Sequence, residues 1–387
     1  MNLRYKIDDI VTLIMDYRGK TPKKLGMDWT ENSRDILAIS AKNIKNGRLI
    51  NKDKAHYGDE NLYKKWMKDG DIKVGDILMT SEAPLGESYL ITKPLKAILS
   101  QRTFLIRLNK ELADPWFFYS LIQSPMFKMK LLAKATGTTV IGIKQKELRK
   151  IIVDLPSLNI QKKIGYYFKV IDQKIRLNNQ INDNLVELVD SYFINFLNNV
   201  TTVEKTIEDI GTVVGGGTPS KKIAAYWNGD IAWVTPKDLS QHPLIFTSSG
   251  ENYITGLGLA KGSAKLLPTN TILFSSRAPI GYISIAKNNL ATNQGFKSVI
   301  PNKEYSFQFI YELLKHETAA IKNEANGSTF KEISGKKLKQ HIINIPNSED
   351  TSKFNEITKP IFKQLRKLEE ENEKLLAIKK ELLEKYF

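Results

Sequence analysis

The chain has 387 residues, of which 41% are hydrophobic and 26% charged, a composition typical of folded proteins and a length that suits two or three domains. Its 58 Lys and Arg residues outnumber its 42 Asp and Glu residues, so the formal net charge of +16 favours a polyanionic partner, either nucleic acid or an anionic membrane surface. Because cysteine is absent, disulfide scaffolds, thiolate zinc sites and cysteine nucleophiles are excluded.

Five blocks of the first half recur in the second half in the same order, which makes the chain a tandem duplication. The paired blocks are 6–22 with 206–219, 35–44 with 230–239, 76–86 with 271–281, 100–104 with 292–296, and 136–156 with 326–346. We therefore expect one domain used twice, at residues 1–156 and 200–346. Each copy is followed by a segment of a different kind, at residues 157–199 and 347–387.

Within each copy, short β-branched runs bounded by Gly, Pro, Asn or Lys are typical of strands. These runs are DILAIS (35–40), DILMTS (76–81), IAWVTP (231–236), TILFSS (271–276) and YISIAK (282–287). Residues 114–134 and 305–324 carry helical periodicity, and Pro115 stands where a helix would begin. The pattern predicts a mixed α+β domain of about 150 residues.

The segment after each copy carries the heptad repeat of a coiled coil. The predicted seam residues are Ile164, Phe168, Ile171, Ile175, Leu185 and Val189 in the first segment, and Phe354, Ile361, Leu368, Leu375 and Leu382 in the second. Asn178 and Asn182 interrupt the first seam, and a buried Asn in such a seam tends to fix its register.

A single amphipathic helix lying on its own domain would show the same repeat. Two matched segments in one chain favour mutual pairing, and a pseudo-two-fold axis between the copies would make that pairing antiparallel. The predicted fold class is α+β, with two repeated mixed α/β domains separated by two long helices that form an antiparallel coiled coil.

The basic excess lies in the two domains. Residues 1–156 hold 28 basic and 18 acidic residues and residues 200–346 hold 16 and 11, whereas the two helical segments carry net charges of only +1 and 0. A membrane-binding amphipathic helix would show the opposite partition, so nucleic acid is the better partner. No apolar run has membrane-spanning length, and the first ten residues include acids where a signal peptide is apolar. We expect a soluble intracellular protein.

Motifs for catalysis are incomplete. RGKT (18–21) ends like a phosphate-binding loop, but Ile14 stands where that loop needs its first glycine. GLGLAKG (256–262) has Lys261 in place of the third glycine of a dinucleotide-binding loop, and the four histidines are scattered. We therefore predict no catalytic residues and no metal ligands, and a chain that binds without catalysing.

The repeated blocks resemble the specificity subunit of type I restriction–modification enzymes. The resemblance is carried by GGGTPSKKIAAYWNGDIAWVTPKDL (215–239), TILFSSRAPIGYISIA (271–286), TNQGFKSVIP (292–301) and the helical segment 155–193. It implies two target-recognition domains, conserved helices between and after them, and a bipartite double-stranded DNA target with one half-site per domain. The first copy departs from the second in writing DYRGKTP for VVGGGTP, which leaves the shape of that loop open.

The resemblance also implies partners and a place in the cell. The family member docks two modification subunits, which use S-adenosylmethionine to methylate adenine, and ATP-dependent restriction subunits. No cofactor is expected on this chain itself, and S-adenosylmethionine, ATP and Mg²⁺ are expected on the partner subunits. The localisation implied is the cytoplasm of a bacterium or archaeon.

Comparing the two copies sorts the candidate DNA-binding residues. Residues identical in both copies cannot distinguish two half-sites, so they are expected to be scaffold or phosphate contacts. These are Thr21 with Thr218, Lys42 with Lys237, Ser81 with Ser276, and Thr139 with Thr329. Loop positions that differ are better candidates for base readout, because Arg suits guanine, Asn and Gln suit adenine, and carboxylates accept from cytosine.

The differing pairs are Asn43 with Asp238, Glu82 with Arg277, and Arg102 with Gln294, with Gln101 beside Asn293. Neighbouring polar residues complete the predicted DNA-binding set: Lys24, Thr138, Ser220, Lys221 and Ser328. For each single residue, a solvated loop side chain is the alternative interpretation.

Three other functions stay open at this point. An enzyme would need an unrecognised S-adenosylmethionine loop or a metal-binding carboxylate cluster. A DNA-binding adaptor outside restriction would use the helices to recruit a different protein. A specificity subunit of a related class would instead work with a fused nuclease–methyltransferase.

Overall fold

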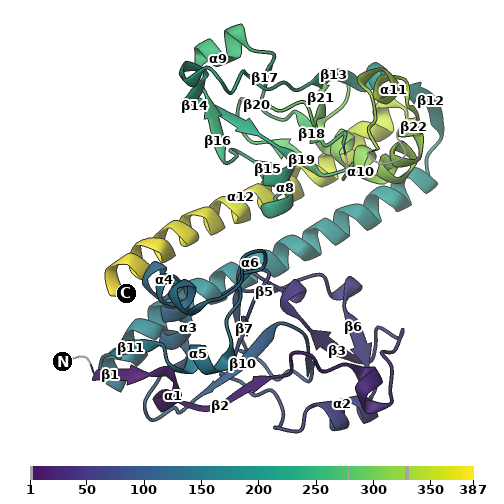
Figure 1. The fold of residues 1–387 in the computed structure, drawn as a ribbon. Coiled ribbons are helices and arrows are strands. Elements are labelled where there is room, and N and C mark those ends of the chain that lie inside the picture. The colour runs from purple at the N-terminus through teal and green to yellow at the C-terminus, as the bar shows by residue number, and fades with distance from the viewer. Residues whose placement is uncertain (1–2, 278, 327–330) are drawn as a thin grey trace. The chain divides into compact units, whose positions relative to one another are not determined.

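The computed structural model describes residues 3–277, 279–326 and 331–387 (Figure 1). Its contacts divide the chain into two compact units: unit 1 holds residues 1–177 and 374–387, and unit 2 holds residues 178–373. Each unit combines one globular head with parts of two long helices, α6 (Leu158–Asn198) and α12 (Ser348–Tyr386). We call residues 3–156 head 1 and residues 202–346 head 2.

Head 1 is built on a four-stranded antiparallel sheet, whose order is β2 (Val11–Asp16), β10 (Thr103–Leu108), β7 (Ile77–Thr80) and β8 (Ser88–Leu90). A second sheet has the order β6 (His56–Gly58), β3 (Ile36–Ile39) and β9 (Ile98–Leu99), with β3 and β9 parallel. Two further pairs are β1 (Leu3–Lys6) with β11 (Ile152–Leu155) and β4 (Ile44–Lys45) with β5 (Arg48–Leu49). The β1–β11 pair brings the two ends of the head together.

The helices of head 1 are short. They are α1 (Ile7–Ile10), α2 (Glu60–Trp66), α3 (Pro115–Gln123), α4 (Pro125–Lys134) and α5 (Gln145–Arg149), with 3-10 helices η1 (Pro22–Leu25), η2 (Ala41–Asn43) and η3 (Lys52–Lys54).

The four-stranded sheet of head 1 is buried on both faces. Alternate residues of β7 point to opposite sides, so Ile77 and Met79 join one apolar cluster with α3 and α4, while Leu78 joins another with α2, β3 and β9. Each such fully buried side chain contributes about 1.5–3 kcal/mol of hydrophobic stabilisation. A sheet covered on both faces gives the loops at its ends a rigid base.

Head 2 repeats this plan with additions. Its larger sheet has the order β13 (Gly211–Gly215), β21 (Lys297–Pro301), β18 (Ile272–Phe274), β19 (Ile283–Ala286) and β15 (Phe246–Thr247). A second sheet has the order β16 (Asn252–Ile254), β14 (Trp227–Val234), β20 (Leu290–Thr292) and β17 (Leu266–Leu267). The pair β12 (Thr202–Thr206) and β22 (Ile342–Pro346) closes the head as β1 and β11 do in head 1.

The helices of head 2 follow the same order as those of head 1. They are α7 (Ile207–Ile210), α8 (Pro236–Gln241), α9 (Gly256–Lys261), α10 (Phe307–Glu324) and α11 (Gly335–Gln340), with the 3-10 helix η4 (Ala224–Tyr226). The predicted α+β class is confirmed. Four of the predicted strand runs contain β3, β7, β18 and β19, and the fifth, 231–236, overlaps the end of β14, which begins earlier, at Trp227.

The helical periodicity predicted over residues 114–134 is confirmed, and the segment is divided there into two helices, α3 and α4. Ser124 takes an extended conformation with ψ of 150°, ends α3, and caps α4 by accepting a hydrogen bond from the Phe127 N–H. Pro125 then begins α4, since proline cannot donate within a helix and restricts the residue before it. In head 2, α10 has no such proline and runs unbroken from Phe307 to Glu324.

In unit 1 the end of α12 runs antiparallel to the start of α6. The Phe387 ring lies 5.9 Å from the Phe168 ring, and the Lys379 Nζ lies 2.8 Å from Asp172 Oδ1. Moving from Asp172 back to Phe168 along α6 thus corresponds to moving forward from Lys379 to Phe387 along the other segment of the pair, which is an antiparallel arrangement. Phe387 also packs against Phe117 of head 1, with ring centroids 5.1 Å apart.

Unit 2 shows the same antiparallel pairing between the rest of the two helices. The Phe354 ring, near the start of α12, lies 5.2–5.6 Å from the rings of Tyr192, Phe193 and Phe196, near the end of α6. The pairing predicted from the heptads is thus confirmed within each unit. All eleven predicted seam residues are buried or half-buried.

Asparagines form a polar layer between the helices in unit 2. Asn178 is fully buried, and its Nδ2 donates to Glu371 Oε2 at 2.8 Å and to Asn372 Oδ1 at 3.0 Å. Asn372 in turn donates to Asn179 Oδ1 at 3.0 Å. Because a shifted register would leave these amides buried without partners, the layer favours one alignment of the two helices.

Each head is anchored to its helix by an arginine, and the two arginines are 190 residues apart. Arg176 of α6 donates to the Leu90 carbonyl at 3.3 Å and lies 4.8 Å from the Tyr89 ring centre in head 1. Arg366 of α12 donates to the Lys287 carbonyl at 3.3 Å and lies 5.8 Å from the Phe246 ring centre in head 2. The duplication therefore extends to the joint between head and helix.

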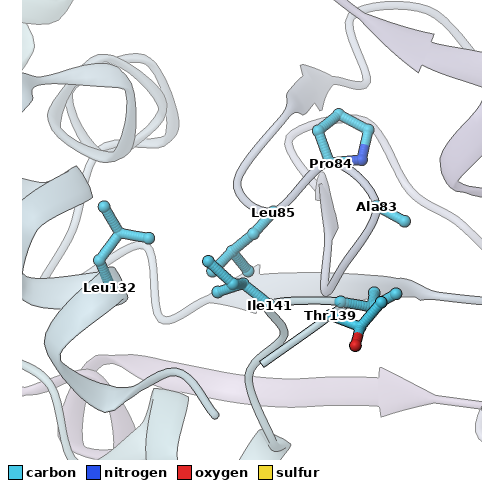
Figure 2. Close-up of a pocket in the computed structure, with 7 residues that line it drawn as sticks. Ala83, Pro84, Leu85, Leu132, Thr139 and Ile141 are labelled. Carbon is cyan, nitrogen blue, oxygen red and sulfur yellow. The ribbon is translucent and has the colours of Figure 1, made fainter. Parts of the chain in front are cut away.

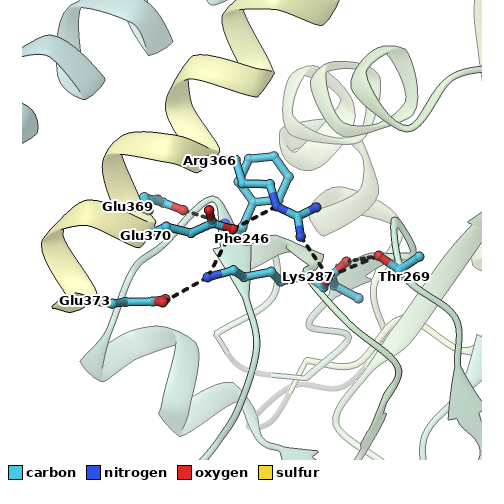
Figure 3. A network of polar contacts seen from close by, with 8 residues as sticks. Phe246, Thr269, Lys287, Arg366, Glu369, Glu370 and Glu373 are labelled. Atoms are coloured by element: carbon cyan, nitrogen blue, oxygen red, sulfur yellow. Dashed lines mark hydrogen bonds and ion pairs between the residues drawn. The ribbon is translucent and has the colours of Figure 1, made fainter.

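The joint in unit 2 includes further carboxylates of α12 (Figure 3). Lys287 Nζ lies 2.9 Å from Glu373 Oε2 and 3.5 Å from Glu370 Oε1. Glu369 is buried and accepts hydrogen bonds from the N–H groups of Ile245 and Phe246, at 2.9 and 3.0 Å. These contacts fix the edge of the sheet of head 2 on the helix.

A buried carboxyl group makes the stability of unit 2 depend on pH. Glu312 of α10 is 3% exposed, and burial raises its pKa from 4.5 to about 8, with Lys315 opposing and Asp190 adding to the shift. The unfolded chain releases this proton near pH 4.5 and the folded chain does not. The contribution of Glu312 to stability therefore falls as the pH rises from about 4.5 to about 8.

We predict that Glu312→Gln, which mimics the neutral acid, raises the melting temperature of the full chain by at least about 2–4 °C at pH 8. The gain should shrink towards pH 5, where the wild-type carboxyl is already protonated. Glu356→Gln on the exposed face of α12 is the matched control and should change nothing. Differential scanning calorimetry between pH 5 and pH 9 checks this, and an equal effect at all pH values would contradict it.

Candidate nucleic-acid interface

Four loops correspond between the two heads and carry most of the predicted DNA-binding residues. We name them by shared sequence features: the TP loop (17–22 and 215–219), the AP loop (81–86 and 275–281), the central loop (100–102 and 292–295) and the TG loop (136–143 and 326–333). Residues 278 and 327–330 of head 2 lie outside the described residues, so nothing is assigned to the predicted Ser328 and Thr329.

In head 1 the central loop joins the TP loop to the AP loop. The side-chain amide of Gln101 donates to the Lys20 carbonyl at 2.6 Å and accepts from the Gly19 N–H at 3.3 Å. The Ser81 N–H then donates to the carbonyl of Arg102 at 2.9 Å. Gln101 is therefore a scaffold residue, because both ends of its amide already hold the TP loop.

The TG loop closes the ring of loops in head 1. The Ile143 N–H donates to the Ser81 carbonyl at 2.9 Å, and Arg18 Nη1 donates to the Ile143 carbonyl at 2.9 Å. Arg18 is itself held by Asp16, whose Oδ1 lies 2.9 Å from its Nε. The four loops thus stand side by side on the same edge of the head.

Three of these joins recur in head 2. The Gly217 N–H donates to the Thr292 carbonyl at 2.8 Å, and the Ser276 N–H donates to the Gly295 carbonyl at 2.7 Å. The Ile333 N–H donates to the Ser276 carbonyl at 2.9 Å. The two heads therefore present the same backbone frame with different side chains.

Glycines allow the TP loop of head 2 to approach its neighbours. A Cβ at Gly216 would lie 2.0 Å from the carbonyl oxygen of Asn293, and one at Gly217 would lie 2.2 Å from that of Ser263. Thr218, the residue after them, contacts Gln294 of the central loop through its hydroxyl group. A side chain at Gly216 would push the TP loop away from the central loop, and one at Gly217 would push it away from Ser263.

The proposal that Asn43 reads a base needs correction. Asn43 is 3% exposed, and its Oδ1 accepts from the N–H and the hydroxyl of Ser40 at 3.0 and 2.9 Å. Its Nδ2 donates to the carbonyls of Ile50 and Asn51, both at 3.2 Å. A buried side chain with all these partners caps η2 and has nothing left for a base edge.

The same correction applies to Asp238. It is 7% exposed, and its Oδ2 accepts from the Thr235 N–H and hydroxyl at 2.7 and 2.6 Å while its Oδ1 accepts from the Glu251 N–H at 2.9 Å. Asn43 and Asp238 are thus equivalent cap residues. The match between copies was right, and the role assigned to it was wrong.

The other predicted residues differ in accessibility. Ser81 and Ser276 are fully buried and belong to the scaffold. Four are half-buried: Thr21, Glu82, Thr218 and Asn293. Ten are exposed: Lys24, Lys42, Arg102, Thr138, Thr139, Ser220, Lys221, Lys237, Arg277 and Gln294. The exposed group is the part of the predicted set that a DNA duplex could contact.

Two arginines of these loops are paired with glutamates. Arg102 Nε lies 3.0 Å from Glu82 Oε1 in head 1, and Arg277 Nε lies 3.1 Å from Glu332 Oε1 in head 2. Lys297 Nζ lies 3.9 Å from the same oxygen of Glu332, and burial lowers the pKa of Lys297. Glu332, Lys297 and Arg18 were not predicted, although aligning the copies shows Glu332 opposite Gly142.

A shallow pocket of about 400 Å³ lies between the AP and TG loops of head 1 (Figure 2). Its lining is mainly apolar and consists of Ala83, Pro84, Leu85, Leu132, Thr139, Val140 and Ile141. Only the hydroxyl of Thr139 among these side chains can donate or accept a hydrogen bond.

Two further findings concern the described residues only. In residues 3–277, 279–326 and 331–387, no group of three or more His, Asp or Glu side chains is arranged to hold a metal ion. Within the same ranges, no helix combines the length and the apolar character needed to cross a membrane.

Comparison with known families decides the assignment. The model of the type I restriction modification DNA specificity domain matches residues 4–187 and again residues 199–384. The chain belongs to this family. Each match spans one head and most of the helix that follows it, in agreement with the duplication. Specificity subunits are the non-catalytic DNA-recognition components of type I enzymes, so DNA-target recognition is the role of this family.

Curated relatives agree with the family. The type I restriction enzyme MjaIX specificity subunit of Methanocaldococcus jannaschii is 42% identical over 47% of this chain and 43% of its own length. The EcoR124I/EcoR124II specificity subunit of Escherichia coli is 33% identical over 40% of this chain and 39% of its own length. These matches span less than half of either relative.

A solved structure supports the fold. The S subunit of a type I restriction–modification system from M. genitalium matches with a TM-score of 0.57 and 17% sequence identity, covering 100% of this chain and 96% of that one. At this identity the match shows the fold alone.

We predict that Asp238→Ala lowers the free energy of unfolding by about 1–2 kcal/mol, because it removes a capping box. The base sequence recognised should not change, since Asp238 is buried. Lys237→Ala is the neighbouring control: its side chain is exposed, so it should alter stability by less than about 0.5 kcal/mol. Urea denaturation measures stability, and a changed recognition sequence in Asp238→Ala would contradict the cap assignment.

Proposed function

We propose that this chain is the DNA-reading subunit of a type I restriction–modification complex, in which each head reads one half of a bipartite double-stranded target. The single observation that carries this proposal is that the AP loop is joined to the central loop and to the TG loop by main-chain hydrogen bonds in both heads. A common backbone frame suits a common task, namely docking on a duplex through phosphates, while the differing side chains suit different base sequences.

The basic excess of the heads supports a duplex as the ligand. Exposed lysines lie at matching places in the two heads, as Lys42 in head 1 and Lys237 in head 2. Contacts between such lysines and phosphates release counterions and supply affinity that does not depend on sequence. The half-sites are then distinguished by the exposed residues that differ between the heads.

The proposed partners are two modification subunits and ATP-dependent restriction subunits. S-adenosylmethionine would bind to the modification subunits, which methylate adenine, and ATP and Mg²⁺ would bind on the partner subunits. The chain itself would take no catalytic part. Because its ligand is proposed to be cellular or incoming DNA, the complex would act in the cytoplasm of a bacterium or archaeon.

An apolar stripe on α6 in unit 1 is the proposed docking surface for a modification subunit. Ile160, Tyr167, Val170 and Leu177 are each 41–51% exposed, and their spacing of seven, three and seven residues places them on one side of the helix. Exposed apolar stripes on a helix are typical of sites that pack against a partner helix. The stripe lies beside the seam, so docking would leave the α6–α12 pairing intact.

The experiment is methylome sequencing of a host that expresses the chain with its cognate modification subunit. We predict a motif of two short half-sites separated by a fixed unread spacer. Duplicating residues 171–177 in α6 and the facing residues 374–380 in α12 would add one heptad to each helix. This is about 10 Å of length or about three base pairs, so the spacer should lengthen while both half-sites stay the same.

A control inserts the heptad in α6 alone, which breaks the pairing of the helices and should abolish methylation. A contiguous motif without a spacer would contradict the proposal. So would a double duplication that changes the half-site sequences and leaves the spacer length as it was.

A further inference from the structure

Each head holds one arginine braced by a glutamate where the AP loop meets its neighbours. The side chains of Arg102 and Arg277 are 51% and 48% exposed, and those of their partners Glu82 and Glu332 are 29% and 38% exposed. In both pairs the carboxylate contacts Nε of the guanidinium.

The two pairs are assembled from different positions of the same frame. Glu82 and Arg277 occupy the same place in the AP loop, and each forms an antiparallel bridge with the TG loop, at Gly142 and Glu332 respectively. The acid of head 1 thus stands where head 2 has its arginine. Both heads therefore have an Arg–Glu pair at this junction. The arginine belongs to the central loop in head 1 and to the AP loop in head 2.

The glycine of head 1 leaves room for Glu82 at this junction. A Cβ at Gly142 would lie 2.9 Å from Cβ of Glu82 and 3.1 Å from its Oε2, so a side chain there would require the AP loop of head 1 to shift. A glutamate at position 142, as head 2 has at Glu332, would also place two like charges side by side. Each head carries one acid at this junction.

Arg102 also occupies an unfavourable backbone conformation. Its φ is +61°, in the left-handed region, which is unfavourable for a residue with a Cβ. A surface ion pair is too weak to offset that strain. Stability alone therefore does not explain an arginine at this place, and functional sites are where such strain collects.

The acid of head 2 is neutralised from a second side. Lys297, which is half-buried on β21, lies 3.9 Å from Glu332, and the corresponding residue of head 1 is Leu105. Glu332 thus stands between two cations. This favours a role in holding Arg277 over a direct contact of Glu332 with DNA.

We propose that Arg102 and Arg277 each read a guanine, one in each half-site, and that Glu82 and Glu332 are positioning residues. The carboxylate fixes the guanidinium by Nε, and Nη1 and Nη2 then donate to N7 and O6 of guanine as a bidentate pair. This inference rests on the proposed function and adds to it the base that each half-site must contain.

The test uses the assembled complex with its modification subunits and a set of targets that carry single-base substitutions. The quantity measured is the ratio of affinities for the cognate target and the target in which one guanine is replaced. Arg277→Lys keeps the charge but loses the fork, and should lower this ratio about 5- to 150-fold at one guanine of one half-site. Arg102→Lys should do the same in the other half-site only.

Glu332→Gln should lower the same ratio as Arg277→Lys but by less, and the double variant should lose no more than Arg277→Lys alone. Lys237→Ala is the control in the same head, and should weaken binding to all targets equally. The control thus keeps the wild-type ratio of affinities. A variant that binds the cognate and the substituted target with the same affinity has a ratio of one, and this counts as loss of base reading.

Unchanged ratios in both lysine variants would overturn the inference while leaving the proposed function intact. Failure of the proposed function would look different, because the wild-type complex would then show no bipartite motif at all. A Glu332→Gln complex with the wild-type ratio would remove Glu332 as a positioning residue and leave Arg277 as a reader without a brace.

Discussion

Main-chain hydrogen bonds between loops are the interaction on which both heads depend. The carbonyl of Ser81 or Ser276 accepts from the TG loop, and the N–H of the same residue donates to the central loop. These bonds involve backbone atoms, so the loops can change their side chains without losing their arrangement. A domain whose base specificity can vary requires that the loop arrangement not depend on the side chains that vary.

The frame is useful only if each head is fixed to a helix, and the structure supplies that joint twice. Arg176 and Arg366 each place a guanidinium beside an aromatic ring and a main-chain carbonyl of their own head. Within each unit the two helices run antiparallel, and the hydrogen bond between buried Asn178 and half-buried Asn372 favours one register in unit 2. Each head is therefore fixed to its part of the helix pair within its own unit.

Local sequence patterns predicted most of the fold. Strand runs, heptads and the duplication are periodic features, and periodicity reports which side of an element is buried. Pro125 marks the break between α3 and α4 in the sequence, although the helical periodicity continues on both sides of it. The cap role of Asn43 had a signature too, since Ser40 stands three residues before it as Thr235 does before Asp238.

The candidate site was less predictable, because its chemistry depends on residues far apart in the chain. Arg277 and Glu332 are separated by 55 residues, and no spacing rule connects a residue of the AP loop with one of the TG loop. Comparing the copies found the positions that differ, but it could not show which of them are buried. Asp238 and Arg277 were both predicted to read bases, but Asp238 is a buried helix cap and Arg277 is exposed.

The most direct measurement replaces residues 203–345 of head 2 by residues 3–155 of head 1 and sequences the methylome of a host carrying this chain with its modification subunit. The two grafted ends are paired strands in both heads, so the strand pair that closes the head is preserved. If each head reads one half-site by itself, the motif becomes an inverted repeat of the first half-site. Retention of the original second half-site would show that the sequence is read elsewhere.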